Sequence, residues 1–317
     1  MAAGAPRRYT SARMSVTPAT PLSTPAGGLA RFALPLLLLG AVAIACSPIF
    51  VRLSELGPIA TAVHRVLLAL PVLLLMQRIA PKQRAQTTPK GGDWLLLALA
   101  GFMFAGDLAT WHWSIGMTSV ANATLLANFA PIFVALFSWL VFKERFSRLF
   151  LAGLTLAMVG AMTLMGASLN VGLDTLYGDL VALSCGAFYA GYILSIARLR
   201  SRFDTMTVML WSGLGTFLFL LPLCWAMGES LIATSLYGWL ILLGLAVISH
   251  AGGQSLIAFS LAHLPASFSS VALLTQPVVA ALLAVVILGE LPVIWQAIGG
   301  VIVLLGIYLA KRGTVTP

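Results

Sequence analysis

The chain has 317 residues, of which 60% are hydrophobic and only 9% charged, with a mean hydropathy of +1.01 and a formal net charge of +9. A soluble domain carries roughly 25% charged residues, so the composition excludes a soluble globular fold and indicates an integral membrane protein. The positive charge does not indicate nucleic-acid binding, because the basic residues lie in short clusters between apolar runs and form no basic face.

Residues 1–31 contain Arg, Ser, Thr, Pro and Ala but no acidic residue. This composition is typical of a disordered cytoplasmic tail, although it also resembles an organellar transit peptide, and Met14 is an alternative start. We expect the tail, with a second short tail at 311–317.

Apolar runs of about 20 residues, long enough to cross a bilayer as helices, follow in chain order. The sequence predicts an all-α membrane protein with ten transmembrane helices, near 32–52, 58–78, 94–114, 119–141, 148–168, 176–197, 205–227, 235–260, 265–288 and 291–310. Short connections make neighbouring helices antiparallel. Cys46, Cys185 and Cys224 lie inside apolar segments without paired spacing, which favours free thiols over a disulfide or a metal site.

The basic residues are distributed on one side of these predicted spans. With the N-terminus inside, 16 of the 18 Lys and Arg residues fall in inner segments; Arg52 falls in an outer loop and Arg65 within a span. This positive-inside bias predicts that both termini are cytoplasmic.

An internal repeat relates the two halves of the chain by a shift of 146 residues. The shift pairs Gly, Arg, Ser, Pro, Ala, Leu and Glu residues, namely Gly40 with Gly186, Arg52 with Arg198, Gly106 with Gly252, Ser114 with Ser260, Pro131 with Pro277, Ala135 with Ala281, Leu136 with Leu282, Glu144 with Glu290, Gly153 with Gly299, and Gly160 with Gly306. Each half (32–168 and 176–310) holds five helices, an odd number, so the halves insert upside down relative to each other. Inverted repeats are typical of alternating-access transporters with a site near the midplane.

Two segments at matching places in the repeats resemble a known family. APIFVALFSWLVFKE (130–144) and QPVVAALLAVVILGE (276–290) resemble the end of each EamA repeat in the drug/metabolite transporter superfamily, and YGDLVALSCGAFYAGYILSIARL (177–199) resembles the opening of the second repeat. The similarity covers about residues 32–310. It implies a ten-helix bacterial inner-membrane exporter of small metabolites, with exporters of amino acids, including aromatic ones, as the nearest kind.

The family also includes carriers of sugar phosphates and nucleotide sugars, which present several Lys or Arg residues to anionic substrates. This chain has only Arg65 at membrane depth, which argues against a phosphorylated substrate.

Charged side chains are costly in a bilayer and usually face a cavity or a partner. In the third span, Asp107, Trp111 and Ser114 share one helix face, whereas His112 points about 140° away from Asp107. An indole beside an acidic side chain suits a substrate with an ammonium group. The alternative is that Asp107 pairs with Arg65 and holds the second and third spans together.

Further candidates lie in the second and eighth spans. His64 and Arg65 lie about two turns from the outer end of the second span, where Arg65 either snorkels to the interface or contacts substrate. His250 and Gln254 share a face of the eighth span, where they either line the opposite cavity wall or form interhelical hydrogen bonds.

The fourth and ninth spans carry polar faces that lead into prolines at matched positions. Such kinks are tolerated in a membrane where side chains, water or a cavity satisfy the freed carbonyls. We therefore expect both kinks to line the cavity, although purely structural kinks are the alternative. The polar residues there are Thr124, Asn128, Ser269 and Gln276. Tyr189 and Tyr192 in the sixth span and Trp211 in the seventh are aromatic candidates for the cavity wall, with packing inside the bundle as the favoured alternative.

Gly153 and Gly160, like Gly299 and Gly306, recur at seven-residue spacing in the fifth and tenth spans. Small residues on one face allow close helix approach. These spans are predicted to be scaffold or the surface of a possible homodimer.

The sequence thus predicts a carrier that exports small zwitterionic or amphipathic metabolites by alternating access, with amino acids that have aromatic or apolar side chains as the expected substrates. A drug efflux carrier and a passive channel are the alternatives, and Asp107 or a histidine is a hypothetical proton carrier. The expected partners are a small-molecule substrate and the lipid bilayer. Neither a nucleic acid nor a cofactor is expected, and no enzyme motif such as HExxH, a paired-Cys motif, a nucleophile elbow or a phosphate loop occurs.

Overall fold

The computed structural model describes residues 30–79, 88–115, 117–118, 120–165, 176–288 and 294–314. These residues form helices without any strand. Ten helical stretches among them are long and apolar enough to cross a membrane: Ala33–Leu53, Pro58–Ile79, Gly92–Ser114, Asn122–Phe142, Arg148–Met165, Leu176–Arg200, Thr205–Ala226, Leu236–Ser260, Ala266–Leu283 and Ile294–Gly313. We number them spans 1 to 10, and they confirm the predicted all-α, ten-helix, multi-pass membrane architecture. Met14, Glu290 and most of the two expected tails lie outside the described residues.

Five spans are regular helices through their whole length. They are span 3, α5 (Gly92–Ile115); span 5, α8 (Arg148–Met165); span 6, α9 (Leu176–Arg200); span 7, α10 (Thr205–Ala226); and span 10, α15 (Ile294–Gly313).

The other five spans change conformation near mid-depth. Four consist of two helices: span 1 of α1 (Ala33–Ala45) and α2 (Ser47–Leu53), span 2 of α3 (Pro58–Leu67) and α4 (Ala69–Ile79), span 4 of α6 (Val120–Ala127) and α7 (Ala130–Phe142), and span 9 of α13 (Ala266–Ala272) and α14 (Thr275–Leu288). In span 8, a π-helix (Leu245–Gln254) separates α11 (Leu236–Gly244) from α12 (Ser255–Ser260). A short 3-10 turn (Ala30–Phe32) precedes α1.

A proline follows each of the four breaks within a few residues: Pro48, Pro71, Pro131 and Pro277. Proline lacks the N–H that would bond the carbonyl four residues earlier, so the regular helical pattern is interrupted there. In span 9 the Leu273 carbonyl instead accepts a shorter-range bond of 2.9 Å from the Gln276 N–H. The kinks at Pro131 and Pro277 were predicted from the sequence, whereas those in spans 1 and 2 were not.

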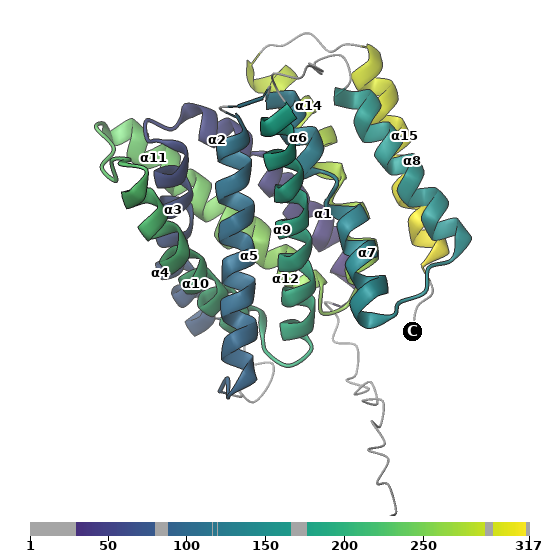
Figure 1. The fold of residues 1–317 in the computed structure, drawn as a ribbon, viewed down its shortest axis with the longest axis horizontal. Helices are drawn as coiled ribbons and strands as arrows, with labels where there is room; N and C mark the ends of the chain where they lie inside the picture. The colour runs from purple at the N-terminus through teal and green to yellow at the C-terminus, as the bar shows by residue number, and fades with distance from the viewer. Residues whose placement is uncertain are drawn as a thin grey trace, which may run out of the picture.

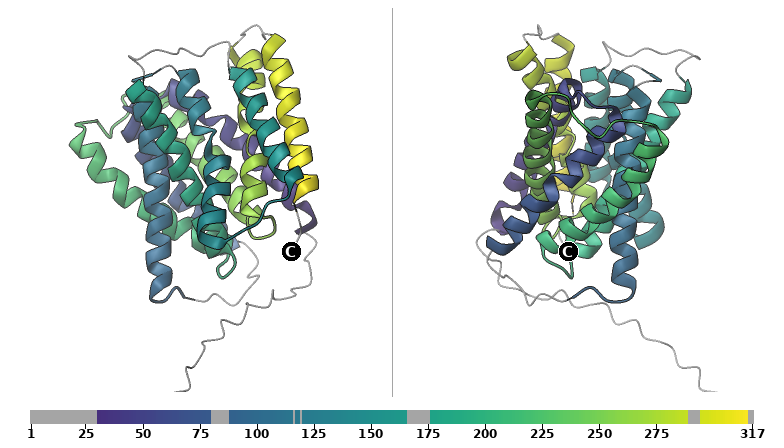
Figure 2. Two further views of the ribbon diagram at one scale, coloured as in Figure 1. Left: turned by 45° about the vertical axis from the view of Figure 1, so that its right-hand side comes forward. Right: turned by 90° about the vertical axis from the view of Figure 1, so that its left-hand side faces the viewer.

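The two repeats interleave rather than forming two separate lobes. In Figure 1, α8 and α15, the last spans of the two repeats, lie side by side at one edge of the bundle. In the centre, α5 of the first repeat packs against α9 and α10 of the second, and α1 packs against the π-helix. The left view of Figure 2 shows the same pairing of α8 with α15 from another direction.

The glycines of spans 5 and 10 form the seam between α8 and α15. A Cβ atom on Gly160 would lie 2.5 Å from the Val303 nitrogen, and one on Gly299 would lie 2.7 Å from the Gly160 carbonyl oxygen. Such distances leave no room for any side chain, so the small residues allow the two backbones to touch. The glycine faces of α8 and α15 therefore pack against each other within one chain. Dimerisation through these spans remains a prediction, and it would use their outer faces.

Carboxylates connect the two repeats at one end of the bundle, which we call the Glu55 end (connections 54–57 and 227–235). Oε2 of Glu229 accepts a 2.7 Å hydrogen bond from the Ala60 N–H at the start of α3. Glu55 reciprocates by accepting bonds from the backbone and hydroxyl groups of Thr234 and Ser235 at the start of α11. Hydrogen bonds from the Ser235 and Thr234 side chains lower the pKa of the Glu55 carboxyl. Each loop thus caps a helix of the other repeat.

The opposite end, which we call the Glu144 end (connections 143–147, 201–204 and 261–265), carries its own links between the repeats. Asp93 forms an ion pair with Arg202, and Ser267 donates a 2.8 Å hydrogen bond to Glu144. Ser147 donates to the carbonyl of Gly313 at 2.6 Å.

Candidate functional site

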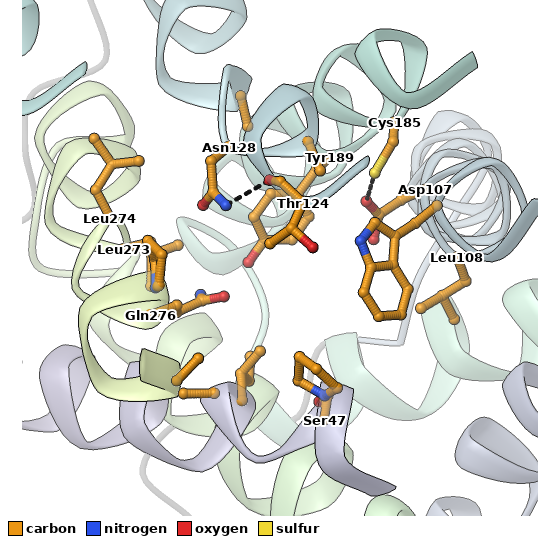
Figure 3. A pocket seen from close by; sticks show the side chains of 18 of the residues that line it. Ser47, Asp107, Leu108, Thr124, Asn128, Cys185, Tyr189, Leu273, Leu274 and Gln276 are labelled. Carbon is orange, nitrogen blue, oxygen red and sulfur yellow. Dashed lines mark hydrogen bonds between the residues drawn. The ribbon is translucent and has the colours of Figure 1, made fainter. Parts of the chain in front are cut away.

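A cavity of about 150 Å³ lies among the broken spans (Figure 3). Its lining comes from spans 1, 2, 3, 4, 6, 8 and 9, whereas spans 5, 7 and 10 contribute no lining residue. Prolines remove the N–H partner of the carbonyls at Ile44, Ala127 and Leu273, and all three of these residues line the cavity. The cavity therefore lies at the interrupted helices. This is expected, because irregular backbone at membrane depth is tolerated where it lines a cavity or is buried in protein.

The lining of spans 4 and 9 is built from positions that the 146-residue shift relates. Thr124 corresponds to Ser270, Ala127 to Leu273, Ala130 to Gln276, and Pro131 to Pro277, and all eight residues line the cavity. The cavity therefore lies where the two repeats meet. That is the place at which inverted-repeat carriers bind their substrates.

Asp107 supplies the acidic side of the cavity. The Cys185 thiol donates a 3.0 Å hydrogen bond to its Oδ1, and Trp111, one turn further along α5, also lines the cavity. Figure 3 shows Asp107 on one side of the cavity and Gln276 on the other. The stripe predicted on span 3 thus contributes Asp107 and Trp111, but not Ser114, to the wall.

Arg65 supplies a positive charge to the same cavity. Its side chain is buried, with a relative exposure of 5%, and its guanidinium carbon lies 5.8 Å from the centre of the Phe104 ring. Asp107 acts on it electrostatically, yet the two side chains form no ion pair within 4.0 Å, and Nε of Arg65 has no hydrogen-bond partner among the described residues. Arg65 therefore neither snorkels to the interface nor forms the direct Asp107 pair considered as an alternative.

Three carboxamides and a phenol belong to the neutral polar part of the lining. Asn128 donates a 2.7 Å bond to the Thr124 carbonyl and so satisfies a backbone group next to the break in span 4. The carboxamides of Gln254 and Gln276 lie near the Tyr189 hydroxyl. In the described part of the chain, neither this hydroxyl nor Oε1 of Gln254 forms a hydrogen bond of ordinary geometry with a protein atom. These groups are available to a ligand. Over the same ranges, no group of three His, Cys, Asp or Glu side chains is arranged to hold a metal ion.

Seven of the fifteen predicted residues do not line the cavity: His64, His112, Ser114, Tyr192, Trp211, His250 and Ser269. Three of them bond the backbone of their own helix: His64 the Ala60 carbonyl, His112 that of Leu108, and Ser114 that of Trp111. Trp211 is half-exposed and packs edge-on against Trp94 near the Glu144 end, because α10 as a whole turns away from the cavity.

Tyr192 and His250 lie behind the cavity wall rather than in it. Both pack on Phe104, with ring centroids 4.5 Å and 5.5 Å away, and Phe104, unlike them, lines the cavity. Ser269 is fully buried, whereas its neighbour Ser270 lines the cavity and donates to the Ser267 carbonyl. The break in span 9 shifts the helix face that points inward, which the α-helical spacing could not indicate.

Four lining residues that carry polar or aromatic groups were not predicted from the sequence: Ser47, Phe104, Cys185 and Ser270. For Ser270 a signal was present, since it is the repeat mate of Thr124. Ser47 precedes Pro48, so reading every proline within a span as a break would have pointed to it.

A family model described as the EamA-like transporter family matches residues 31–166 and again 176–312. A protein of Archaeoglobus fulgidus described as an uncharacterized transporter is 29% identical over 277 residues, which cover 82% of this chain and 91% of the relative. A pseudopaline exporter, CntI, of Pseudomonas aeruginosa is 27% identical over 181 residues, covering 57% of this chain and 60% of the relative. A probable terminal-alkyne amino-acid exporter of Streptantibioticus cattleyicolor is 25% identical over 227 residues, covering 71% and 76%.

A crystal structure covering 89% of this chain and 97% of its own shares the fold with a TM-score of 0.76 at 18% identity. The two family matches coincide with the two five-helix repeats and together span most of the chain. This chain therefore belongs to the EamA-like transporter family.

Proposed function

We propose that the protein exports small amphipathic metabolites, most suitably amino acids with an apolar side chain, by alternating access. The observation that carries the proposal is the cavity at the boundary of the two repeats, where lining positions of spans 4 and 9 correspond pair by pair. Two matched, inverted halves around one site provide two related ways to close it, one for each side of the membrane.

The chemistry of the lining supports an amphipathic substrate. Asp107 and Arg65 supply opposite charges, and Asn128, Gln254 and Gln276 supply hydrogen-bonding groups. Most of the remaining lining is apolar or aromatic, including Ile44, Leu108, Trp111 and Ile193. A few polar groups in an otherwise apolar wall are typical of sites for small organic molecules.

The size of the cavity favours a compact substrate. Its volume of about 150 Å³ equals that of cavities that hold a single benzene-sized ligand. A small or branched aliphatic amino acid is therefore the best match to this conformation, and an indole side chain needs the cavity to widen.

Two of the relatives are named as exporters: one is a pseudopaline exporter, and the other is a probable terminal-alkyne amino-acid exporter. These names support export of amino-acid-like molecules as the proposal for this chain. We further propose that the protein lies in a bacterial inner membrane with both termini and the Glu144 end in the cytoplasm, as the distribution of Lys and Arg predicts.

The test is transport by the purified full-length chain in proteoliposomes. Labelled leucine, threonine and tryptophan are followed across the membrane, with empty liposomes as the control. We expect protein-dependent flux that excess unlabelled amino acid suppresses, with leucine and threonine moving faster than tryptophan. Folded, inserted protein that moves none of the three would contradict the amino-acid proposal and favour an exporter of other metabolites or drugs.

The same assay distinguishes a carrier from a passive channel. A carrier that binds substrate and changes conformation shows saturation and trans-stimulation by substrate on the far side. Flux that rises linearly with concentration would contradict alternating access.

A further inference from the structure

The cavity contains one acidic and one basic side chain that face the same space without forming an ion pair with each other. Asp107 accepts a hydrogen bond from Cys185, and Arg65 leaves its Nε without a partner among the described residues. Both side chains line the cavity, and the other described residues of the lining are uncharged. Resting on the proposed function, we infer that Arg65 binds the carboxylate and Asp107 the ammonium group of a free amino acid, so that the cavity selects zwitterions.

Burial explains why the pair selects for both charges together. A buried charge without a partner of opposite sign is strongly unfavourable. A zwitterion brings one charge of each sign, so Arg65 and Asp107 each gain an opposite partner and the filled cavity stays neutral. A cationic drug satisfies Asp107 but adds positive charge beside Arg65, and an organic anion does the reverse.

The surroundings of each charge fit its assigned partner. Trp111 lines the cavity one helical turn from Asp107, and an indole face attracts an ammonium group. The guanidinium of Arg65 is planar, and it can donate two parallel hydrogen bonds to a carboxylate. Phe104 holds Arg65 from one side through a cation–π contact at 5.8 Å, which fixes its position without using its donors.

The neutral part of the cavity then receives the side chain of the amino acid. Ile44, Leu108 and Ile193 provide apolar contacts, whereas Asn128 and Gln276 lie at the breaks of spans 4 and 9. Specificity for the side chain is therefore set by shape, and specificity for the backbone groups by Arg65 and Asp107.

The experiment compares three molecules with the same side chain as competitors of labelled leucine flux in proteoliposomes. Unlabelled leucine carries both charges, leucinamide only the ammonium group, and N-acetyl-leucine only the carboxylate. For the unmodified protein we expect leucinamide and N-acetyl-leucine each to compete about 10- to 100-fold more weakly than leucine, because each loses one charged hydrogen-bonded contact. This comparison does not depend on any variant folding.

Two substitutions then assign the charges. In Arg65→Gln, leucine should lose its advantage over leucinamide but keep its advantage over N-acetyl-leucine. Asp107→Asn should show the opposite pattern. The matched controls are Arg202→Gln and Asp93→Asn, which remove the same two groups from the ion pair at the Glu144 end and should leave the order of the three competitors unchanged.

The outcomes separate the two levels of the proposal. Leucine flux with equal competition by all three molecules, or equal loss of both preferences in each variant, would overturn the zwitterion inference while leaving the exporter intact. Absence of flux for every amino acid would overturn the proposed function and the inference together.

Discussion

The Sγ atom of Cys185 donates a hydrogen bond of 3.0 Å to Oδ1 of Asp107. The bond joins α9 of the second repeat to α5 of the first, and both side chains line the cavity. A thiol therefore lies directly beside the carboxylate to which we assign the ammonium group of the substrate.

This placement predicts that bound substrate shields Cys185 from alkylation. Because Cys185 is only 2% exposed, it should react only when the cavity opens. In a chain with Cys46→Ser and Cys224→Ser, N-ethylmaleimide should therefore modify Cys185 slowly, and the modification should block transport. A substrate at ten times its Kd should slow the modification about tenfold, because only the unoccupied protein reacts. Mass spectrometry of the intact chain measures the rate, and identical rates with and without a transported substrate would place the binding site elsewhere.

The break in span 9 should be needed for the transport cycle more than for folding. Pro277→Ala restores an N–H that can bond the Leu273 carbonyl and straighten the helix. If breaking the straightened helix in each transport cycle costs about 1 kcal/mol, flux should fall roughly five- to tenfold. Pro222→Ala is the matched control, because Pro222 lies inside the continuous helix α10, which does not line the cavity. Equal effects of the two substitutions on flux would show that the break has no special role.

The seam between α8 and α15 predicts a large difference between two neighbouring positions. Gly160→Ala places a methyl group 2.5 Å from the Val303 nitrogen and should lower the free energy of unfolding by about 1–3 kcal/mol through overpacking. Val159→Ala, at an exposed position on the same helix, should change it little. Thermal unfolding of both purified variants in detergent measures the difference, and similar midpoints would mean that the seam is looser than described.

The lowered pKa of Glu55 predicts a pH-dependent link at the Glu55 end. Because the folded-state pKa lies below the unfolded one, which is about 4.3, the carboxylate stabilises the fold above that pH. The contribution is lost as the pH falls through the folded-state value. Thermal unfolding between pH 3 and 6 should therefore depend less on pH in Glu55→Gln than in the unmodified chain.

Thr234→Val keeps the carboxylate but removes a hydroxyl donor to it, so it should remove part of the same pH dependence. An unchanged profile in both variants would show that the stability at acidic pH is set by other groups.

The spans could be predicted from the sequence because each depends on local hydrophobicity and length. The predicted limits of span 2 (58–78) and span 8 (235–260) differ from Pro58–Ile79 and Leu236–Ser260 by one residue at an end. The repeat was equally accessible, since Pro131 and Pro277 mark it directly in the sequence.

The orientation of individual side chains around the cavity was harder to predict. Helical spacing placed Ser114 with Asp107, and Ser269 with Gln276, but the spacing fails across a break and says nothing of how deep a cavity extends. His250 was chosen as a polar residue of span 8, yet the π-helix around it changes which residues share a face. Tertiary packing on Phe104, which no local pattern encodes, decides that His250 and Tyr192 lie behind the wall.

The pairing of α8 with α15 also has a consequence for biosynthesis. A ribosome delivers α8 before spans 6 to 9, whereas its partner α15 emerges only after them. Until then the glycine face of α8, with Gly153 and Gly160, has only lipid or insertion machinery to contact. The first repeat therefore cannot complete its own packing during synthesis, and α15 closes this seam only after spans 6 to 9 have been made.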